Sequence, residues 1–413
     1  MSKIAFETNV EKTMELEPDD FEMGAVDNDY TVPIKVIGVG GGGGNALEHI
    51  ARNTIFGNVK YLAVNTDVPA LRSKDGKIMK RMQIGKKRTK GRGAGGDPMV
   101  GCESANEDRQ AIEAALDGID MVFISSGMGG GTGTGAAPII AEIAKGMGIL
   151  TIGVVTKPFD FERQQRMNTA LKGIAEMRKF VDALIIIPNQ KLLEINEKSL
   201  NMKAAFDMVN DVLYKVVKSI SEVLNKTSDI NIDFADLTTI MKDSGDAHIA
   251  IGMGTGDNKV DEAVQQIINS PLLETSINNA SKMMVHISMS SDAILSDIDQ
   301  IIDKLTAAAH PDVFVKSGCN MTDEQLKDTV VVTVVATSFT DAPRRQQVTR
   351  PPLTEPINAG NTQQLQDAQS LFETPRGEPQ SLDSFITGSF SPISGGHDDD
   401  SYNDLEKIFG SKF

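Results

Sequence analysis

Residues 121–138 read MVFISSGMGGGTGTGAAP. Met121–Ser125 is a short apolar run typical of a buried strand, and a helical pattern follows Pro138. A strand, then glycines, then a helix N-terminus lets backbone N–H groups reach phosphate oxygens without obstruction by Cβ atoms. The stretch therefore predicts a phosphate-binding cradle at the end of a strand.

A second glycine segment, Gly40–Gly44, lies near the N-terminus and directly follows the apolar run Ile34–Val39. Gly38, Gly40 and Gly43 satisfy G-x-G-x-x-G, and Asp67 stands where a ribose-binding acid would, so a nicotinamide-dependent dehydrogenase is an alternative.

Two glycine cradles in one sheet suit a nucleoside di- or triphosphate better than a nicotinamide dinucleotide. The P-loop motif G-x-x-x-x-G-K-[ST] does not occur. We expect backbone N–H groups, Thr132 and an added metal ion to hold the phosphates.

Short apolar runs alternate with helical stretches, which is the βαβ rhythm of a doubly wound parallel sheet. The predicted strands are Ile34–Val39, Tyr61–Asn65, Met121–Ser125, Leu150–Thr156 and Ala183–Pro188. A long helix is predicted over Lys203–Asn225. Its apolar residues recur at the spacing of a buried helix face: Phe206, Val209, Leu213, Val216, Ile220 and Val223. Strands at Met283–Met289, Val313–Lys316 and Val330–Thr337, with helices near 261–269 and 292–308, predict a second, smaller α/β domain.

Composition excludes several classes of protein. No apolar run among the 413 residues approaches the roughly 20 residues that a membrane helix needs. The two cysteines are too few for a disulfide framework or a four-ligand zinc site, and no histidine spacing is typical of metal binding. Residues 1–31 hold nine acids and two lysines, without the pattern of a signal or transit peptide. These features predict a cytoplasmic protein.

Charge and low-complexity patterns describe the remaining segments. The net charge of −16 would discourage nucleic-acid binding if it were uniform, but it is concentrated in both tails. We expect no nucleic-acid partner. The basic stretch Arg72–Arg92 has no interleaved aromatic residue, so we interpret it as a solvated loop near an anionic ligand.

Residues 341–395 lack apolar periodicity and predict a disordered linker. Residues 396–413 include apolar side chains at helical spacing, namely Tyr402, Leu405, Ile408 and Phe409. This tail predicts a short partner-binding helix.

Five motifs in this order resemble the tubulin/FtsZ family of GTPases, over about residues 32–340. They are Gly40–Asn45, Asn65-Thr66-Asp67, Gly129–Gly135, Thr156-Lys157-Pro158-Phe159 and Asn231-Ile232-Asp233-Phe234-Ala235-Asp236. The resemblance implies a GTP-binding domain over 32–202, a central helix over 203–226 and a C-terminal activation and polymerisation domain over 227–340. An acidic N-terminal extension (1–31), the linker and the tail peptide flank them. It also implies GTP, GDP and Mg²⁺ as ligands.

The resemblance further implies a set of nucleotide contacts. They are Gly41, Gly42, Gly43, Gly44 and Asn45 at the phosphates and sugar; Gly131, Thr132 and Gly133 at the β- and γ-phosphates; Glu162 and Arg166 at the ribose and phosphate; and Asn189, Phe206, Asn210 and Asp211 at guanine. Whether Asn210 or Asp211 faces the base stays open. Without the family, Glu162 and Arg166 would be interpreted as a surface ion pair on one helical face, and Phe206 as core.

Asn231, Asp233 and Asp236 are the implied catalytic residues, and they follow the C-terminal end of the long helix. At roughly 1.5 Å per residue, that helix places them on the order of 30 Å from guanine contacts at its start. They would then act only in a neighbouring subunit, through a head-to-tail contact that generates filaments. Helix capping is the alternative role for these acids.

The resemblance therefore implies a polymerising GTPase of the cytokinetic ring at midcell, whose tail binds membrane adaptors and other division proteins. The alternative is a related cytoskeletal GTPase for DNA segregation or cell shape.

Overall fold

The computed structural model describes residues 32–53, 58–195, 201–225, 230, 232–270, 277–290, 294–321 and 326–339. All of them belong to one unit of the chain. The predicted N-terminal extension, linker and tail peptide lie outside the described residues, and so does Asn231.

The described residues contain one ten-stranded sheet in the order β3-β2-β1-β4-β5-β6-β7-β10-β8-β9. The strands are β1 (Ile34–Val39), β2 (Val59–Asn65), β3 (Lys80–Gln83), β4 (Met121–Gly127), β5 (Leu150–Lys157), β6 (Ala183–Pro188), β7 (Gly245–Thr255), β8 (Ala280–Ser288), β9 (Phe314–Asn320) and β10 (Thr329–Phe339). The first six are parallel and follow the 3-2-1-4-5-6 order of doubly wound nucleotide-binding sheets. β10 runs antiparallel to both β7 and β8. The predicted α/β fold class is confirmed.

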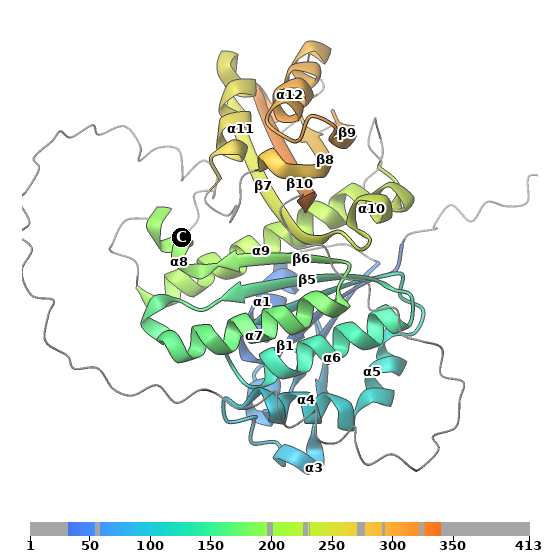
Figure 1. Cartoon of the computed structure of the whole chain (residues 1–413), viewed down its shortest axis with the longest axis vertical. Coiled ribbons are helices and arrows are strands. Elements are labelled where there is room, and N and C mark those ends of the chain that lie inside the picture. Colours follow the sequence, from blue (N-terminus) through green and yellow to red (C-terminus); the bar gives the residue numbers. More distant parts are fainter. Residues whose placement is uncertain are drawn as a thin grey trace, which may run out of the picture. The chain divides into compact units, whose positions relative to one another are not determined.

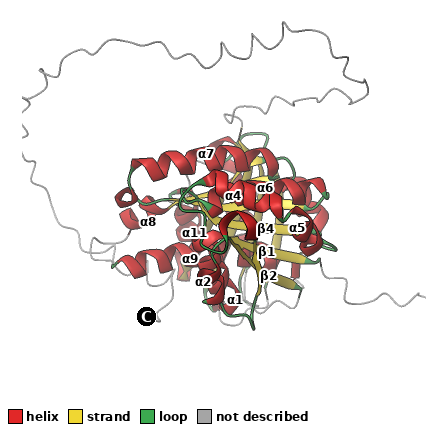
Figure 2. Cartoon of the chain, turned by 90° about the horizontal axis from the view of Figure 1, so that it is seen from below, coloured by secondary structure: helices red, strands yellow, loops and turns green. Residues whose placement is uncertain are grey.

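Helices cover both faces of the sheet. They are α1 (Gly40–Asn53), α2 (Val68–Arg72), α3 (Lys86–Thr89), α4 (Pro98–Glu107), α5 (Arg109–Leu116), α6 (Thr132–Gly146), α7 (Gln164–Phe180), α8 (Asn189–Ile195), α9 (Met202–Asn225), α10 (Phe234–Met241), α11 (Lys259–Ile268) and α12 (Leu295–Ala307). Within the described ranges, no helix is long and apolar enough to cross a bilayer. Figure 2 shows α1 and α9 on one face, and α4, α6 and α7 on the other.

This two-sided cover explains the apolar strands. Val36 packs in the core beneath α1 and α9, whereas its neighbour Ile37 packs in the core beneath α5, α6 and α7. Successive side chains of a strand point to opposite faces, so a strand buried on both faces needs an unbroken apolar run. The apolar runs that predict the parallel strands have this cause.

Helix α9 packs against both halves of the sheet. The predicted stripe is confirmed for Val209, Leu213, Val216, Ile220 and Val223, each no more than 5% exposed. Their core also contains Ile249, Met284 and Val335 from the C-terminal strands. Phe206 departs from the stripe, because it is 40% exposed. The helix runs from α8 at one end to α10 at the other (Figure 1).

Three expectations about elements need correction. The stretch Arg72–Arg92 contains β3 and α3, so it is not simply a loop. Strand β7 was not predicted, and it continues the parallel sheet by pairing Ala183 of β6 with Gly245. The first glycine segment does not precede its helix, because α1 begins at Gly40. Of the second segment, the glycines up to Gly131 precede α6 as expected, and the rest lie inside the helix, which begins at Thr132. The domain boundaries at residues 202 and 226 stay predictions.

Candidate nucleotide-binding site

The two glycine segments meet where the strand order of the sheet reverses. β1 and β4 are neighbours, but the chain continues from them to opposite sides of the sheet. In open α/β sheets, ligands bind outside the carboxyl ends of the strands at this point. Because α1 follows β1 and α6 follows β4, both helix N-termini lie there.

Close backbone contact explains why glycines start these helices. Gly40 has a φ of +75°, and a Cβ there would lie 2.9 Å from the amide nitrogen of Gly133. A Cβ on Gly43 would lie 2.3 Å from the carbonyl oxygen of Ser125 in β4. Real Cβ atoms do not approach backbone so closely, so a side chain at Gly40 would push α1 away from α6, and one at Gly43 would push α1 away from β4.

The same segments leave donors and space for an anion. A Cβ on Gly41 or Gly130 would have nothing within 4 Å. Helix α6 has no side-chain cap at Gly131, and its first residue, Thr132, places Oγ1 2.7 Å from Oγ1 of Thr66. The first N–H groups of a helix lack intrahelical partners and carry partial positive charge. Two such helix ends form a cradle suited to phosphate groups.

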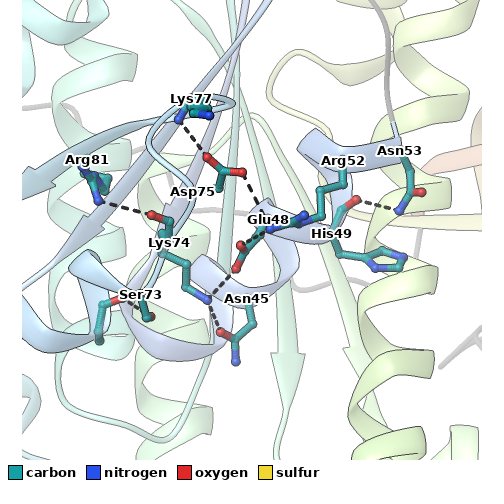
Figure 3. A network of polar contacts seen from close by, with 11 residues as sticks. Asn45, Glu48, His49, Arg52, Asn53, Ser73, Lys74, Asp75, Lys77 and Arg81 are labelled. Carbon is teal, nitrogen blue, oxygen red and sulfur yellow. Dashed lines mark hydrogen bonds and ion pairs between the residues drawn. The ribbon is translucent and has the colours of Figure 1, made fainter.

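A lysine that sequence analysis missed lies beside this cradle (Figure 3). Lys74 Nζ donates to Asn45 Oδ1 at 2.5 Å and to Glu48 Oε2 at 3.1 Å. Lys74 and Asn45 line one cavity together with Gly41 and Gly44. Burial acts to raise the pKa of the Glu48 carboxyl, but hydrogen bonds from Arg52 and Lys74 outweigh it and lower the pKa. The only signal in the sequence was the basic character of Arg72–Arg92.

Glu162 and Arg166 form an ion pair, which was the alternative interpretation of these residues, with Oε2 and Nε 3.0 Å apart. They do not share one helix as expected: Glu162 ends a 3₁₀ turn (Asp160–Glu162), and Arg166 lies in α7 beyond Arg163, whose φ is +76°. Glu162 Oε1 also accepts from the Phe159 amide at 3.0 Å. A Cβ on Gly129 would lie 2.7 Å from Cγ of Arg166. The pair therefore lies against the second glycine segment.

Aromatic and amide groups lie at the start of α8 and α9. The exposed ring of Phe206 meets the buried ring of Phe159 edge to face, with centroids 5.3 Å apart. Asn189 is 4% exposed, and its Oδ1 has no hydrogen-bond partner within the described part of the chain. A buried acceptor without a partner is costly, so it fits a donor from a ligand.

Helix α9 also carries Asn210 and Asp211, both partly exposed. Oδ1 of Asp211 lies 2.6 Å from Nε2 of His49 in α1. This contact joins the helix of the first glycine segment to the helix of the predicted guanine contacts. Sequence analysis missed His49, because no local pattern links it to Asp211.

Asp233 is the N-cap of α10, and Asp236 lies in the first turn of that helix. Helix α10 lies at the other end of α9 (Figure 1). Asp233 Oδ1 accepts from the Asp236 amide at 2.7 Å, so the predicted capping role is present. Asp236 Oδ1 lies 2.7 Å from Nζ of Lys316. From Phe206 to Asn225, α9 rises about 30 Å. The candidate residues therefore form two separate groups.

The protein offers few ligands of its own to a metal ion. Across the described residues there is no group of three or more His, Cys, Asp or Glu side chains that could hold one. Mg²⁺ commonly keeps its waters and binds through substrate phosphates with one or two carboxylates. The arrangement fits a Mg²⁺ ion that arrives with the nucleotide.

Comparisons with known proteins show the family of this chain. The model of the tubulin/FtsZ family GTPase domain matches residues 33–197, and that of the FtsZ family C-terminal domain matches residues 245–340. The cell division protein FtsZ of Wigglesworthia glossinidia brevipalpis is 47% identical over 307 residues, which cover 74% of this chain and 79% of that protein. The chain belongs to the FtsZ family. Its membership confirms the predicted GTPase and decides against the dehydrogenase alternative.

Solved structures of the FtsZ family and its relatives share the fold. An empty FtsZ dimer from M. jannaschii has a TM-score of 0.70 at 38% identity, covering 78% of this chain and 92% of that one. The GTPγS-bound CetZ2 protofilament from Haloferax volcanii has a TM-score of 0.64 at 20% identity, covering 76% of this chain and 95% of that one. The second comparison supports the fold alone.

Proposed function

We propose that this chain is a cell-division GTPase that polymerises head to tail and forms the cytokinetic ring at midcell, in the cytoplasm. The carrying observation is the separation of the two groups of site residues, one at each end of α9. Membership of the FtsZ family favours cell division over the alternative roles in DNA segregation or cell shape. Depletion that leaves cells dividing normally would favour the alternative.

The cradle binds the phosphates of GTP. N–H groups of Gly41–Asn45 and of Gly131, Thr132 and Gly133 point to the phosphate oxygens, and the Thr132 hydroxyl adds one donor. Arg166 contributes positive charge, and Glu162 holds it through their ion pair. Bound Mg²⁺ would neutralise charge on the β- and γ-phosphates. The glycines stabilise the same oxygens as charge builds up during hydrolysis.

Guanine binds between Asn189 and Phe206. The exposed ring of Phe206 stacks on the base, and Asn189 Oδ1 accepts a hydrogen bond from the ligand. We assign the N1–H and N2–H₂ edge to Asp211 rather than Asn210. A carboxylate only accepts, which matches this donor edge, and His49 orients one oxygen while the other stays free for guanine.

Hydrolysis needs a second subunit. Asp233 and Asp236 of one subunit reach the γ-phosphate bound to the next and orient the attacking water. Asp233 caps α10 through Oδ1, which leaves its second oxygen free for this task. The adjoining Asn231 supports the same contact, although it lies outside the described residues. The C-terminal tail, also outside them, binds membrane adaptors and other division proteins.

The decisive experiment is phosphate release from GTP as a function of protein concentration. Completion of the site between subunits predicts almost no turnover below a threshold and linear growth above it. A line through the origin would mean that each chain hydrolyses GTP alone. The placement of Asp233 and Asp236 in a neighbour's site would then be wrong.

A further inference from the structure

The segment that carries the two acids is attached to strand β9, at the edge of the sheet. The backbones of Ile230 and Cys319 exchange two hydrogen bonds, of 3.1 and 3.0 Å. A Cβ on Gly318 would lie 2.9 Å from Cγ1 of Ile232, so Ile232 packs directly on the strand. The backbone leading to α10 is therefore held in place before the acids begin.

Lys316 extends this attachment to the acid itself. Alternate residues of a strand point to the same face, so Lys316 and Gly318 both face this segment. Nζ of Lys316 lies 2.7 Å from Oδ1 of Asp236, which leaves the other carboxylate oxygen free. The hydrogen bond and charge of Asp236 raise the pKa of Lys316, and Asp233 adds to the effect. Lys316 therefore stays charged at neutral pH.

The ion pair between Lys316 and Asp236 holds the carboxylate in place and still leaves it accessible. The side chain of Asp236 is 27% exposed, so a neighbouring subunit can reach it. Its backbone is fixed through the amide that donates to Asp233, and its carboxylate through Lys316. A surface aspartate without such a partner would sample several rotamers. Loss of that freedom before assembly reduces the entropic cost of reaching a productive geometry.

We propose that Lys316 is a positioning residue for hydrolysis: it orients the carboxylate of Asp236 toward the GTP bound to the adjacent subunit. The inference rests on the proposed function, because it requires Asp236 to act in a neighbour. Lys316 acts through Asp236. It does not affect GTP binding by its own chain, because the phosphate cradle lies at the other end of α9.

The test compares Lys316→Met with Lys282→Met. Lys282, on the adjacent strand β8, donates to the carbonyl oxygen of Thr239 in the same helix α10 at 2.8 Å, but it forms no hydrogen bond or ion pair with Asp236. Misplacement of the acid predicts that Lys316→Met lowers kcat per polymerised subunit about tenfold with KM for GTP unchanged. Lys282→Met should stay within about twofold, because it removes only an exposed contact. Lys316→Arg should restore most of the turnover, because it keeps the charge and a donor.

Two results would overturn the proposal: normal turnover in Lys316→Met, or an equal loss in both methionine variants. Asp236→Ala separates this failure from that of the proposed function. If Asp236→Ala hydrolyses GTP normally, the proposed function itself is wrong. If only Asp236→Ala is inactive, the function stands and the role of Lys316 falls.

Co-assembly covers the case in which Lys316→Met does not polymerise alone. Labelled Lys316→Met is mixed with excess wild-type protein, and turnover is measured against the fraction incorporated into filaments. A loss in proportion to that fraction supports the proposal, because each variant subunit leaves one neighbouring GTP without an oriented acid. Unchanged turnover, or failure to incorporate, contradicts it.

Discussion

The phosphate cradle and the acidic segment (Asp233–Asp236, beside β9) differ in the groups that form them. The cradle consists of backbone, and an added Cβ at Gly43 would lie 2.3 Å from a carbonyl oxygen. The acidic segment presents side chains, and Asp236 is held by a single charged partner at the surface. Substitutions in the cradle should therefore act through shape and packing. Those in the acidic segment should act through charge, with the fold preserved.

The largest effect is expected from Gly43→Ala. The new methyl group must push α1 away from β4, so we expect a loss of about 2–3 kcal/mol of stability and no measurable GTP binding. Thermal unfolding and nucleotide titration measure both. Gly146→Ala is the matched control, because a Cβ there meets nothing within 4 Å. Normal GTP binding by Gly43→Ala would contradict a cradle that depends on close backbone contact.

Asp236→Ala should produce the opposite phenotype. The fold and GTP affinity are retained, while turnover falls about a hundredfold, as expected for the loss of a group that positions water. Phosphate release above the assembly threshold measures it. Asp261→Ala removes another exposed acid, which pairs with Lys304, and should leave turnover unchanged. Weakened GTP binding in Asp236→Ala would contradict the assignment of binding to the cradle and of turnover to the acidic segment.

Asp211→Asn tests the proposed guanine contact. Replacing an acceptor by an amide should weaken GTP binding about tenfold or more. It should also shift preference toward xanthosine triphosphate, whose 2-oxo group accepts a hydrogen bond. Competition against a fluorescent nucleotide measures the ratio. Asn210→Ala serves as the comparison; a larger loss there would transfer the guanine contact to Asn210.

The smallest effect is expected from Lys74→Met. This change frees Asn45 and Glu48 from their shared cation, and partly exposed ion pairs contribute roughly 1 kcal/mol or less. We expect GTP affinity to fall less than about fivefold with turnover unaffected. Lys77→Met, an exposed neighbour in the same basic stretch, should change neither. A large loss would mean that Lys74 contacts the phosphates directly.

The two regions also differ in how far the sequence predicts them. The cradle was predictable because its determinants are contiguous: a buried strand followed at once by glycines. The parallel strands were predictable because burial on both faces requires unbroken apolar runs. His49 near Asp211 and Lys316 near Asp236 were not, because each pair joins residues distant in the sequence.

Strands β3 and β7 escaped prediction for local reasons. β3 reads KRMQ, with no apolar alternation. β7 is interrupted by glycines, which weaken a strand signal. The structure explains one of them: a Cβ on Gly254 would lie 1.9 Å from the carbonyl oxygen of Lys259, at the start of α11. The helix packs so closely on the strand that only glycine fits.

The ends of the ten-stranded sheet have a consequence for assembly. An exposed edge strand can pair with another chain and aggregate. Here β3 is only four residues long and carries Lys80 and Arg81, while β9 has part of its edge occupied by Ile230. Both features disfavour growth by strand addition, which would need no nucleotide. The edges thus favour the proposed head-to-tail contact as the route of assembly.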